Sequence, residues 1–233
     1  MTTTIVMGVM DEIVSLNETI KVILSSNEDI EILFVISDKT TKDARQNLES
    51  LIARNDIMRI WKQTKPGVGI AYREGLSLSK SSFVLMMSSD METDPSLVKS
   101  LIHEISNSAL DVVVVSRWRN QNSFNDYNKI LLLANWFFQK ALRFMYKSDL
   151  TDLTYAFRIY KQHALIGCED WKEERHGFFL ESILKPLNNG MKVGEISGSW
   201  KMRDEGVRHI QYRDYLTYVS VMFRCRQKKS WES

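Results

Sequence analysis

The feature that most constrains the fold of this chain is an alternation of short apolar runs with longer amphipathic segments. Apolar, β-branched runs of strand length occupy residues 5–10, 30–36, 83–87 and 112–115, with 57–60 as a weaker candidate. The segments 13–24, 41–53, 70–78 and 95–105 between them have helical spacing. Strands that alternate with helices pair in parallel through right-handed crossovers. We therefore expect an α/β fold with a mostly parallel central sheet flanked by helices.

The second half of the chain follows a looser pattern. Residues 116–128 are polar and typical of a loop, and an apolar helix is predicted at 130–146. The segment 149–160 follows, and then a helix at 178–189, a strand at 191–196 and a final helix from residue 212. With only three prolines and ten glycines, the chain is not expected to contain a flexible linker between two domains.

Composition excludes several classes of protein. Of the 233 residues, 44% are hydrophobic, which suffices for a core and lies outside the disordered range. The two cysteines lack CxxC spacing, so neither a zinc site nor a disulfide framework is indicated and we expect a cytoplasmic protein. The net charge of +2 points to no partner by itself, and no nucleic-acid partner is expected. The N-terminus lacks the basic region of a signal peptide.

Two segments suggest contact with a membrane surface, although no stretch of about 20 apolar residues exists to span one. In the helix at 130–146, Asn135, Gln139 and Arg143 form a polar stripe on an otherwise apolar surface. Such a helix can lie in a membrane interface, or it can be a core helix or a homodimer contact. Residues 201–229 hold eight Lys/Arg against three Asp/Glu, a balance of +5, which suits phosphates or anionic lipid. A solvated basic tail explains that charge equally well.

The run at 83–87 ends in three acids, Asp90, Glu92 and Asp94. Ligands bind at the carboxyl ends of the strands of an open α/β sheet, so these acids lie where a ligand is expected. Asp90 and Glu92 alternate in an extended segment, which places both side chains on one side. Together they can hold Mg²⁺ or Mn²⁺, ions that prefer oxygen ligands and bridge phosphates. The alternative is a solvated turn with acids at a helix N-terminus, which is favourable without any metal.

A set of motifs, in order, resembles family 2 glycosyltransferases, and the likeness is greatest to the branch of polyprenyl-phosphate mannosyl- and glucosyltransferases. The family's Pro-x-x-Asn-Glu turn corresponds to residues 8–12, its Asp-Asp-Gly-Ser to 37–40, and its Gly-x-Gly-x-Ala-x-Arg-x-Gly to 67–75. Its Asp-Ala-Asp-Leu-Gln-Asp-Pro corresponds to 88–95, with one extra residue before the Pro, and its Gly-Ser-Arg to 115–117. Its Asp-x-Thr-x-x-Phe-Arg and Arg-x-x-Gly correspond to 152–158 and 203–206.

The resemblance implies a single-domain nucleotide-diphospho-sugar transferase fold, the Rossmann-like GT-A fold. Residues 1–210 would be the catalytic domain, with 1–116 binding the nucleotide sugar, 117–210 binding the acceptor and 211–233 forming a basic amphipathic helix and tail. The implied activity is metal-dependent transfer of a sugar, with inversion, from a nucleotide-diphosphate sugar to a polyprenyl phosphate or glycan. It would serve cell-surface polysaccharide or glycolipid synthesis, in the cytoplasm or at the inner face of the membrane.

The donor side follows from the matched positions. Asp90 and Glu92 would hold the metal, since a departing diphosphate develops charge that a cation stabilises. Glu12 and Asp38 would hold the base and ribose. Gly67 would let the backbone approach the donor, with Gly69 beside it, although such glycines can equally mark only a turn; Arg73 would reach a phosphate.

The acceptor side would be built by Arg117, Arg158 and Arg203, because Arg binds phosphate bidentately, with Lys201 flanking the acceptor. Asp90, Glu181 and Arg117 are the predicted catalytic residues, and Glu181 would act as general base if the acceptor is a hydroxyl. Asp152 and the pair at 169–170 are weaker candidates for that base, and all of these acids are more often structural.

Two departures from the family pattern concern Ser37 and Ser88, which stand where the family usually has Asp. The first should weaken a contact to the nucleotide, and the second removes one carboxylate beside the metal. The outcome is weaker metal affinity, a different donor, or an inactive homologue that only binds a partner. A sugar-nucleotide nucleotidyltransferase is a further alternative, although the first strand lacks the Gly-rich basic loop that such enzymes use.

Overall fold

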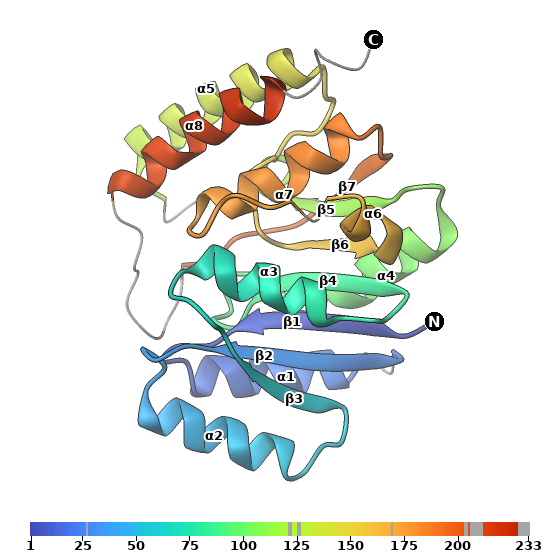
Figure 1. The fold of residues 1–233 in the computed structure, drawn as a ribbon, viewed down its shortest axis with the longest axis vertical. Helices are drawn as coiled ribbons and strands as arrows, with labels where there is room; N and C mark the ends of the chain where they lie inside the picture. Colours follow the sequence, from blue (N-terminus) through green and yellow to red (C-terminus); the bar gives the residue numbers. More distant parts are fainter. Residues whose placement is uncertain are drawn as a thin grey trace.

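The computed structural model describes residues 1–26, 28–120, 123–124, 127–168, 170–202, 205 and 212–227. Within these residues, seven strands form one sheet in the order β3-β2-β1-β4-β6-β5-β7 (Figure 1). The strands are β1 Thr3–Gly8, β2 Ile30–Ile36, β3 Met58–Lys62, β4 Phe83–Ser88, β5 Val112–Ser116, β6 Arg158–Lys161 and β7 Val193–Ser197. The expected α/β fold is confirmed, and the weak candidate at 57–60 is the edge strand β3.

Most pairs in the sheet are parallel, as the alternation predicts. β1 pairs in parallel with β2 and β4, β2 with β3, and β5 with β7. β6 alone runs antiparallel, and it is inserted between β4 and β5. The sequence did not predict this strand, because its four residues include Arg158 and Lys161 and show no apolar run.

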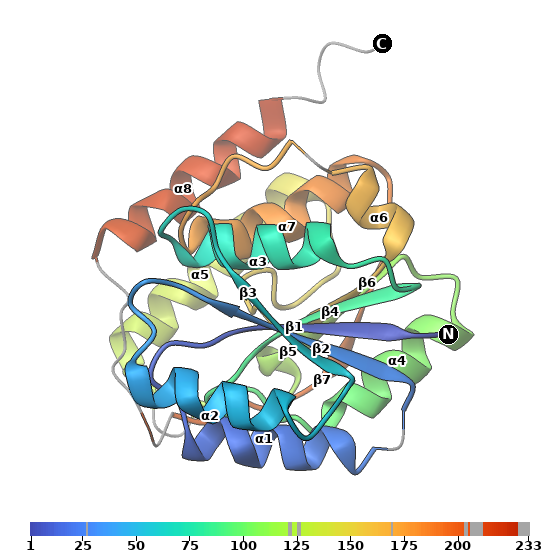
Figure 2. The same cartoon turned by 60° about the horizontal axis from the view of Figure 1, so that its bottom comes forward.

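Helices cover both faces of the sheet. α1 (Val14–Leu24), α2 (Lys42–Ile52) and α4 (Leu97–Asn107) cover one face, while α3 (Val68–Leu78), α6 (Gln162–Ile166) and α7 (Gly177–Asn188) cover the other (Figure 2). α5 (Lys129–Tyr146) and α8 (Tyr212–Gln227) lie beyond α7, at the end of the molecule farthest from α2 (Figure 1). A short 3₁₀ turn, Arg117–Arg119, follows β5.

The packing of the core explains why the apolar run at residues 83–87 forms a strand. In β4, Leu85 and Met87 pack with α1 and α4, while Val84 and Met86 pack with the helices of the opposite face. All four are completely buried, and each such side chain contributes about 1.5–3 kcal/mol. A strand buried on both faces must be apolar throughout, which is the pattern that predicted it.

The carboxyl ends of β1, β2 and β4 meet at one edge of the sheet because these strands are parallel neighbours. β1 ends at Gly8, earlier than the predicted 5–10. The chain turns after this residue, and the backbone N–H of Met10 donates to the Glu12 side chain. The structure therefore places the turns after β1, β2 and β4 side by side, and these turns carry most of the predicted donor residues.

Among the helices of the described residues, none is long and apolar enough to cross a membrane. The apolar helix predicted at 130–146 is α5, and the predicted final helix is α8.

Candidate functional site

The turn after β1 buries a carboxylate at the carboxyl edge of the sheet. Glu12 accepts hydrogen bonds through Oε2 from the backbone N–H of Met10, at 2.7 Å, and of Asp11, at 3.2 Å. Burial raises the pKa of Glu12 above its usual range, the Met10 bond opposes that shift, and the nearby charge of Asp90 adds to it. Glu12 and Asp90 therefore lie within electrostatic reach of each other.

The turn after β4 holds Asp90 in a fixed orientation. Asp90 is buried and accepts a hydrogen bond through Oδ1 from the backbone N–H of Glu92, at 3.1 Å. Met91 between them has a φ of 61°, which lies in the left-handed region. Glu92 is half-buried, so the predicted Asp90–Glu92 pair occupies one tight turn.

The hydroxyl groups of the two serines that precede Asp90 form hydrogen bonds with nearby groups of the protein. The Ser88 hydroxyl lies 3.1 Å from the Thr93 hydroxyl, and Ser89 Oγ donates to the Gly8 carbonyl at 2.8 Å. These bonds tie the β4 turn to itself and to the end of β1. The position where the family usually has an Asp thus carries a neutral group that is already hydrogen-bonded.

Asp94 does not join the other two acids. Its Oδ1 accepts hydrogen bonds from the backbone N–H of Ser96, at 3.0 Å, and from the Ser96 hydroxyl, at 2.6 Å, just before α4. Of the three acids after β4, Asp94 is therefore the one that matches the alternative explanation, an acid at a helix N-terminus. Within the described part of the chain, no group of three or more acidic, His or Cys side chains forms a cluster suited to a metal.

A segment from the far end of the chain crosses the edge beside Asp90. Trp200 forms an antiparallel bridge with Thr93, and the backbone N–H of Lys201 donates to the Glu92 carbonyl at 3.4 Å. The Tyr155 hydroxyl donates to the same carbonyl at 3.1 Å. The segment is thus hydrogen-bonded to the turn that carries the two acids.

Glu205 anchors the same segment on α1. Its carboxylate accepts hydrogen bonds from the backbone N–H groups of Ile13, Val14 and Ser15, at 3.1, 3.2 and 2.8 Å. Burial would raise the pKa of Glu205, but the bonds from Ser15, Val14 and Ile13 outweigh it and hold that pKa below its usual range. Sequence reasoning missed this cap because the partners lie far apart in the chain and no local motif links them.

The glycines at the start of α3 lie close to another segment of the protein. Gly67 has a φ of 130°, and a Cβ on Gly69 would lie 2.7 Å from the Arg175 carbonyl oxygen. The backbone N–H of Ile70 donates to the Glu174 carbonyl at 3.2 Å. The close approach at this helix start is therefore made by residues 174–175. That Gly67 contacts the donor remains a prediction.

Arg73 and Asp38 have protein partners near the same edge. Arg73 donates through Nη1 to the Trp171 carbonyl at 3.2 Å. Asp38 is exposed and pairs with Lys62 at 2.7 Å, and that hydrogen bond holds the pKa of Asp38 below its usual range. Ser37 closes its own turn by accepting from the backbone N–H of Lys39 at 3.1 Å. The donor contacts of Arg73 and Asp38 remain predictions.

Arg117 is engaged by a buried acid. Its Nε and Nη2 donate to Asp152 at 2.7 and 3.0 Å, and its guanidinium lies 4.5 Å from the centre of the Tyr155 ring. Burial would lower the pKa of Arg117, but the Asp152 charge raises it well above the usual range. The two motifs that contain Arg117 and Asp152 therefore meet in an ion pair. Asp152 takes up Nε and Nη2 of Arg117, and the contact of Arg117 with acceptor phosphate remains a prediction.

Arg158 is completely buried in β6. It donates to the Tyr155 carbonyl, and through Nη1 to Ser182 Oγ at 3.4 Å. Its guanidinium lies inside the fold, and its contact with acceptor phosphate remains a prediction.

Glu181 is also completely buried, in α7. Its carboxylate accepts from the backbone N–H groups of Lys172 and Glu173, at 3.0 and 2.8 Å, and pairs with Lys185 at 3.2 Å and Arg224 at 3.6 Å. These contacts join α7, α8 and the preceding loop, and the general-base role of Glu181 remains a prediction.

The remaining acceptor candidates differ in what the structure says of them. Lys201 is exposed next to Glu92, in agreement with a place at the site. Asp170 pairs with Lys185 at 2.9 Å. Arg203 and Glu169 lie outside the described residues.

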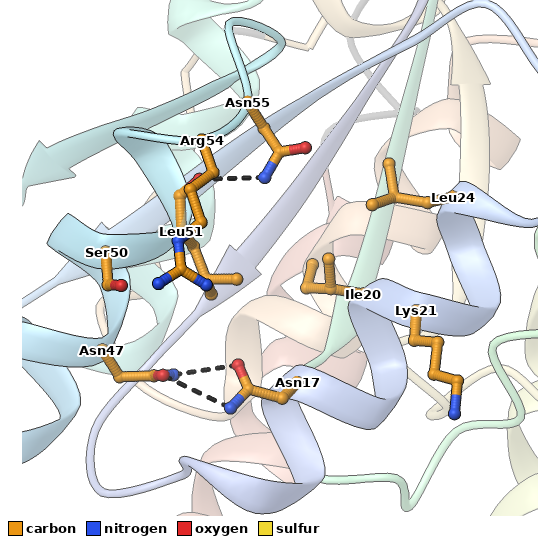
Figure 3. A pocket seen from close by; sticks show the side chains of 9 residues that line it. All are labelled: Asn17, Ile20, Lys21, Leu24, Asn47, Ser50, Leu51, Arg54 and Asn55. Carbon is orange, nitrogen blue, oxygen red and sulfur yellow. Dashed lines mark hydrogen bonds between the residues drawn. The ribbon is translucent and has the colours of Figure 1, made fainter.

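The hollow drawn in Figure 3 is separate from this edge. It has a volume of about 410 Å³ and lies between α1 and α2, where Asn17 and Asn47 hydrogen-bond to each other. A second groove of about 370 Å³ is lined by Trp61, Arg73, Trp171 and neighbours. We assign the site to the turns after β1 and β4, because buried acids at a carboxyl edge carry chemistry that neither hollow offers.

Comparison with known proteins agrees with this geometry. The fold is similar to that of glucosyl-3-phosphoglycerate synthase from Mycobacterium tuberculosis in complex with Mn²⁺, uridine diphosphate and phosphoglyceric acid. That structure has a TM-score of 0.74 and 14% identity, over 96% of this chain and 78% of that one. The same synthase with Mg²⁺ and uridine diphosphate has a TM-score of 0.73 and 14% identity, over 96% of this chain and 79% of that one. At this identity the likeness shows the GT-A fold.

The family is shown by the sequence itself. Residues 4–167 match the family model for glycosyl transferase family 2, and this span includes β1, β4 and the turn that carries Asp90. The chain therefore belongs to glycosyl transferase family 2.

Proposed function

We propose that this protein transfers a sugar, with inversion, from a nucleotide-diphosphate sugar to a phosphorylated acceptor, with a divalent metal at Asp90. The observation that carries the proposal is the buried Asp90 in the turn after β4, at the same carboxyl edge as the turn of the buried Glu12, in a chain of this family. A buried carboxylate such as that of Asp90 is stabilised by a cation that pairs with it.

The residues present fit Mg²⁺ or Mn²⁺ that is shared with a substrate. Asp90 and Glu92 supply hard oxygen ligands from one turn. Mg²⁺ commonly uses only one or two carboxylates and completes its shell with water and substrate phosphates. The metal, when bound, would stabilise charge on the departing diphosphate.

A uridine-diphosphate sugar is the first donor to test. The similar synthase is known in complex with Mn²⁺, uridine-diphosphate-glucose and phosphoglyceric acid. Glu12 and Asp38 remain our proposed contacts to the nucleotide, and Arg73 our proposed contact to a phosphate.

The surroundings of the acids favour a phosphate acceptor over a hydroxyl acceptor. A hydroxyl needs a general base, but among the candidates in the described part of the chain Glu181 and Asp152 are buried in ion pairs and Asp170 pairs with Lys185. A phosphate monoester is largely ionised near pH 7 and needs little help from a base. We therefore propose a lipid phosphate such as polyprenyl phosphate, used on the cytoplasmic side of a membrane in glycolipid or surface-polysaccharide synthesis. Lys201 and Arg203 would contact it.

The test is turnover of uridine-diphosphate-glucose with Mn²⁺ and polyprenyl phosphate. Asp90→Ala should lower the rate at least about a hundredfold, since several kcal/mol of charge stabilisation would be lost. Asp94→Ala is the matched control, because Asp94 lies on the same turn but bonds to Ser96. Equal rates for Asp90→Ala and the unmodified enzyme would eliminate the metal role of Asp90.

The second candidate is a glycosyltransferase-like protein that only binds its ligands. It is favoured by Ser88, whose hydroxyl is hydrogen-bonded to Thr93 where a metal-side acid would be expected. Calorimetry with uridine diphosphate and Mn²⁺ separates the two candidates. Binding without turnover of any donor would support the second, and Ser88→Asp should then raise the affinity for Mn²⁺.

A further inference from the structure

Helix α5 buries a polar residue and exposes many of its apolar residues, which is the reverse of a usual surface helix. Its polar residue Gln139 is buried, donating to Thr154 Oγ1 at 2.8 Å and accepting from the backbone N–H of Leu153 at 3.0 Å. Gln139 also donates to Asn135 at 3.2 Å and to Asp152 at 3.3 Å. Gln139, in the middle of the polar stripe, therefore faces the protein.

The apolar side of α5 faces outward. Phe137 is 60% exposed and Phe144 is 89% exposed. Their spacing of seven residues places both on one side of the helix, together with Ile130 and Leu133. Scattered apolar residues on a surface need no explanation, but a contiguous apolar stripe marks an interaction site.

Helix α8 extends this surface. Leu216, Val219 and Phe223 are exposed at a spacing of three and four residues. The two helices touch, because the Tyr146 hydroxyl donates to the Met222 carbonyl at 2.7 Å and the Phe138 and Tyr218 rings lie 6.3 Å apart. Figure 1 shows both helices along the same end of the molecule. We call the surface made by the exposed apolar residues of these two helices the α5–α8 face. Its residues are Ile130, Leu131, Leu133, Trp136, Phe137, Phe144, Leu216, Val219 and Phe223.

The charged residues within α5 are all basic. α5 contains Lys129, Lys140 and Arg143 and no acid. The single acid of α8, Asp214, is completely buried and accepts from Arg175 at 2.9 Å. Lys140 lies 5.2 Å from the Trp136 ring at the border of the apolar stripe.

We propose that the α5–α8 face docks on an anionic lipid bilayer. Aromatic and aliphatic side chains on one side of a helix, bordered by Lys and Arg, are the pattern of helices that lie in a membrane interface. Anionic headgroups complement the basic residues at the border of the face.

A second copy of the chain fits this face less well. A two-fold interface brings the same patch of both copies together, so Lys129 and Lys140 would face a surface with the same positive border. Like charges placed across an interface oppose association, and Lys is depleted in such interfaces.

The face is joined to the candidate site through the buried side of α5. Gln139 contacts Asp152, Asp152 holds Arg117, and the Arg117 guanidinium lies over the Tyr155 ring, whose hydroxyl donates to the Glu92 carbonyl. A bilayer under α5 would therefore fix the orientation of the acceptor half relative to the lipid. The inference deepens the proposed function, since it brings the enzyme to a lipid-phosphate acceptor, but its test does not depend on turnover.

The test is flotation of the full chain with vesicles of phosphatidylcholine, alone or with about one third phosphatidylglycerol, at low salt. We expect binding to the anionic vesicles, and a Phe137→Glu variant should bind them at least about tenfold less. Ile166→Glu on α6 is the matched control, since Ile166 is 59% exposed and lies outside the face. Circular dichroism checks that both variants fold, and Phe144→Glu provides a second site on the same stripe.

Three results would overturn the proposal. The first is an unmodified protein that floats with neither kind of vesicle. The second is an equal loss of binding for Ile166→Glu and Phe137→Glu. The third is a dimer in light scattering that Phe137→Glu converts to monomer while vesicle binding is absent, which would make the face a subunit contact. Asp90→Ala should float like the unmodified protein, so loss of turnover and loss of docking remain distinguishable.

Discussion

Replacing Asp152 by asparagine should destabilise the whole protein, although Asp152 lies within a motif that suggests catalysis. The carboxylate is buried and accepts hydrogen bonds from Arg117 Nε at 2.7 Å and Arg117 Nη2 at 3.0 Å. The backbone N–H groups of Thr154 and Tyr155 also donate to it, each at 3.2 Å. Asparagine keeps the size of the side chain but removes the charge, so the buried Arg117 loses its counter-ion.

The magnitude follows from the burial of both partners. Removing one member of a buried ion pair costs about 3–5 kcal/mol, because the other charge stays desolvated. For a chain of this size, 1 kcal/mol shifts the Tm by about 2–4 °C, so Asp152→Asn should lower it by about 6–20 °C. Asp170→Asn is the control, since the Asp170 carboxylate is half-exposed and pairs with Lys185, and it should cost less than about 1 kcal/mol.

The same pair predicts a dependence of stability on pH. Burial would raise the pKa of Asp152, but the Arg117 charge and the hydrogen bonds lower it below the usual range. A carboxyl with a lowered folded-state pKa stabilises the fold above its unfolded pKa of about 3.9, and that stability is lost as the pH falls through the folded value. Below about pH 4, the unmodified protein should therefore lose stability with acid more steeply than Asp152→Asn does.

The assay is urea unfolding followed by circular dichroism, with Arg117→Met completing a double-mutant cycle. The double variant should lose less free energy of unfolding than the two single variants lose in sum. The coupling energy should be at least about 2 kcal/mol. Additive losses, or a loss below about 1 kcal/mol for Asp152→Asn, would refute the reasoning.

Two further predictions concern backbone geometry and helix capping. Gly67→Ala should cost about 1–3 kcal/mol in urea unfolding, because its φ is 130° and the new Cβ would meet the Glu174 carbonyl. Gly190→Ala is its control: φ is 76° with open space around it, so a smaller loss is expected, and a loss equal to that of Gly67→Ala would contradict the packing argument. Glu205→Gln removes the charge that caps α1, and faster amide hydrogen exchange at Ser15 should report it; unchanged exchange would show that the cap is dispensable.

The first half of the fold could be predicted because its signal is local. β2 and β4 are apolar at nearly every position, since both of their faces are covered, and amphipathic helices separate them from their neighbours. β6 could not be predicted in this way. Its letters Arg-Ile-Tyr-Lys include two basic residues, and only the tertiary fold explains a completely buried Arg158.

The candidate site could be predicted in position but only partly in chemistry. The motif after β4 correctly places Asp90 at the carboxyl edge, because strand order and turn position are local properties. Arg117 and Glu181 were assigned to the acceptor from motif positions, yet each is held by an ion pair to a residue distant in the chain. Which basic group meets which acid depends on packing between elements, and spacing along the sequence does not encode it.

The insertion of β6 between β4 and β5 has a consequence for synthesis on the ribosome. β5 is a run of four valines and a serine, and its hydrogen-bonded neighbours, β6 and β7, both come later in the chain. β1, β2, β3 and β4 can pair as they emerge, but β5 has to wait until Arg158–Lys161 has been made. During that interval a β-branched, uncharged segment is available to pair with other chains, which is a recognised aggregation hazard. Chaperone dependence in this protein should therefore centre on nascent chains that end between β5 and β6.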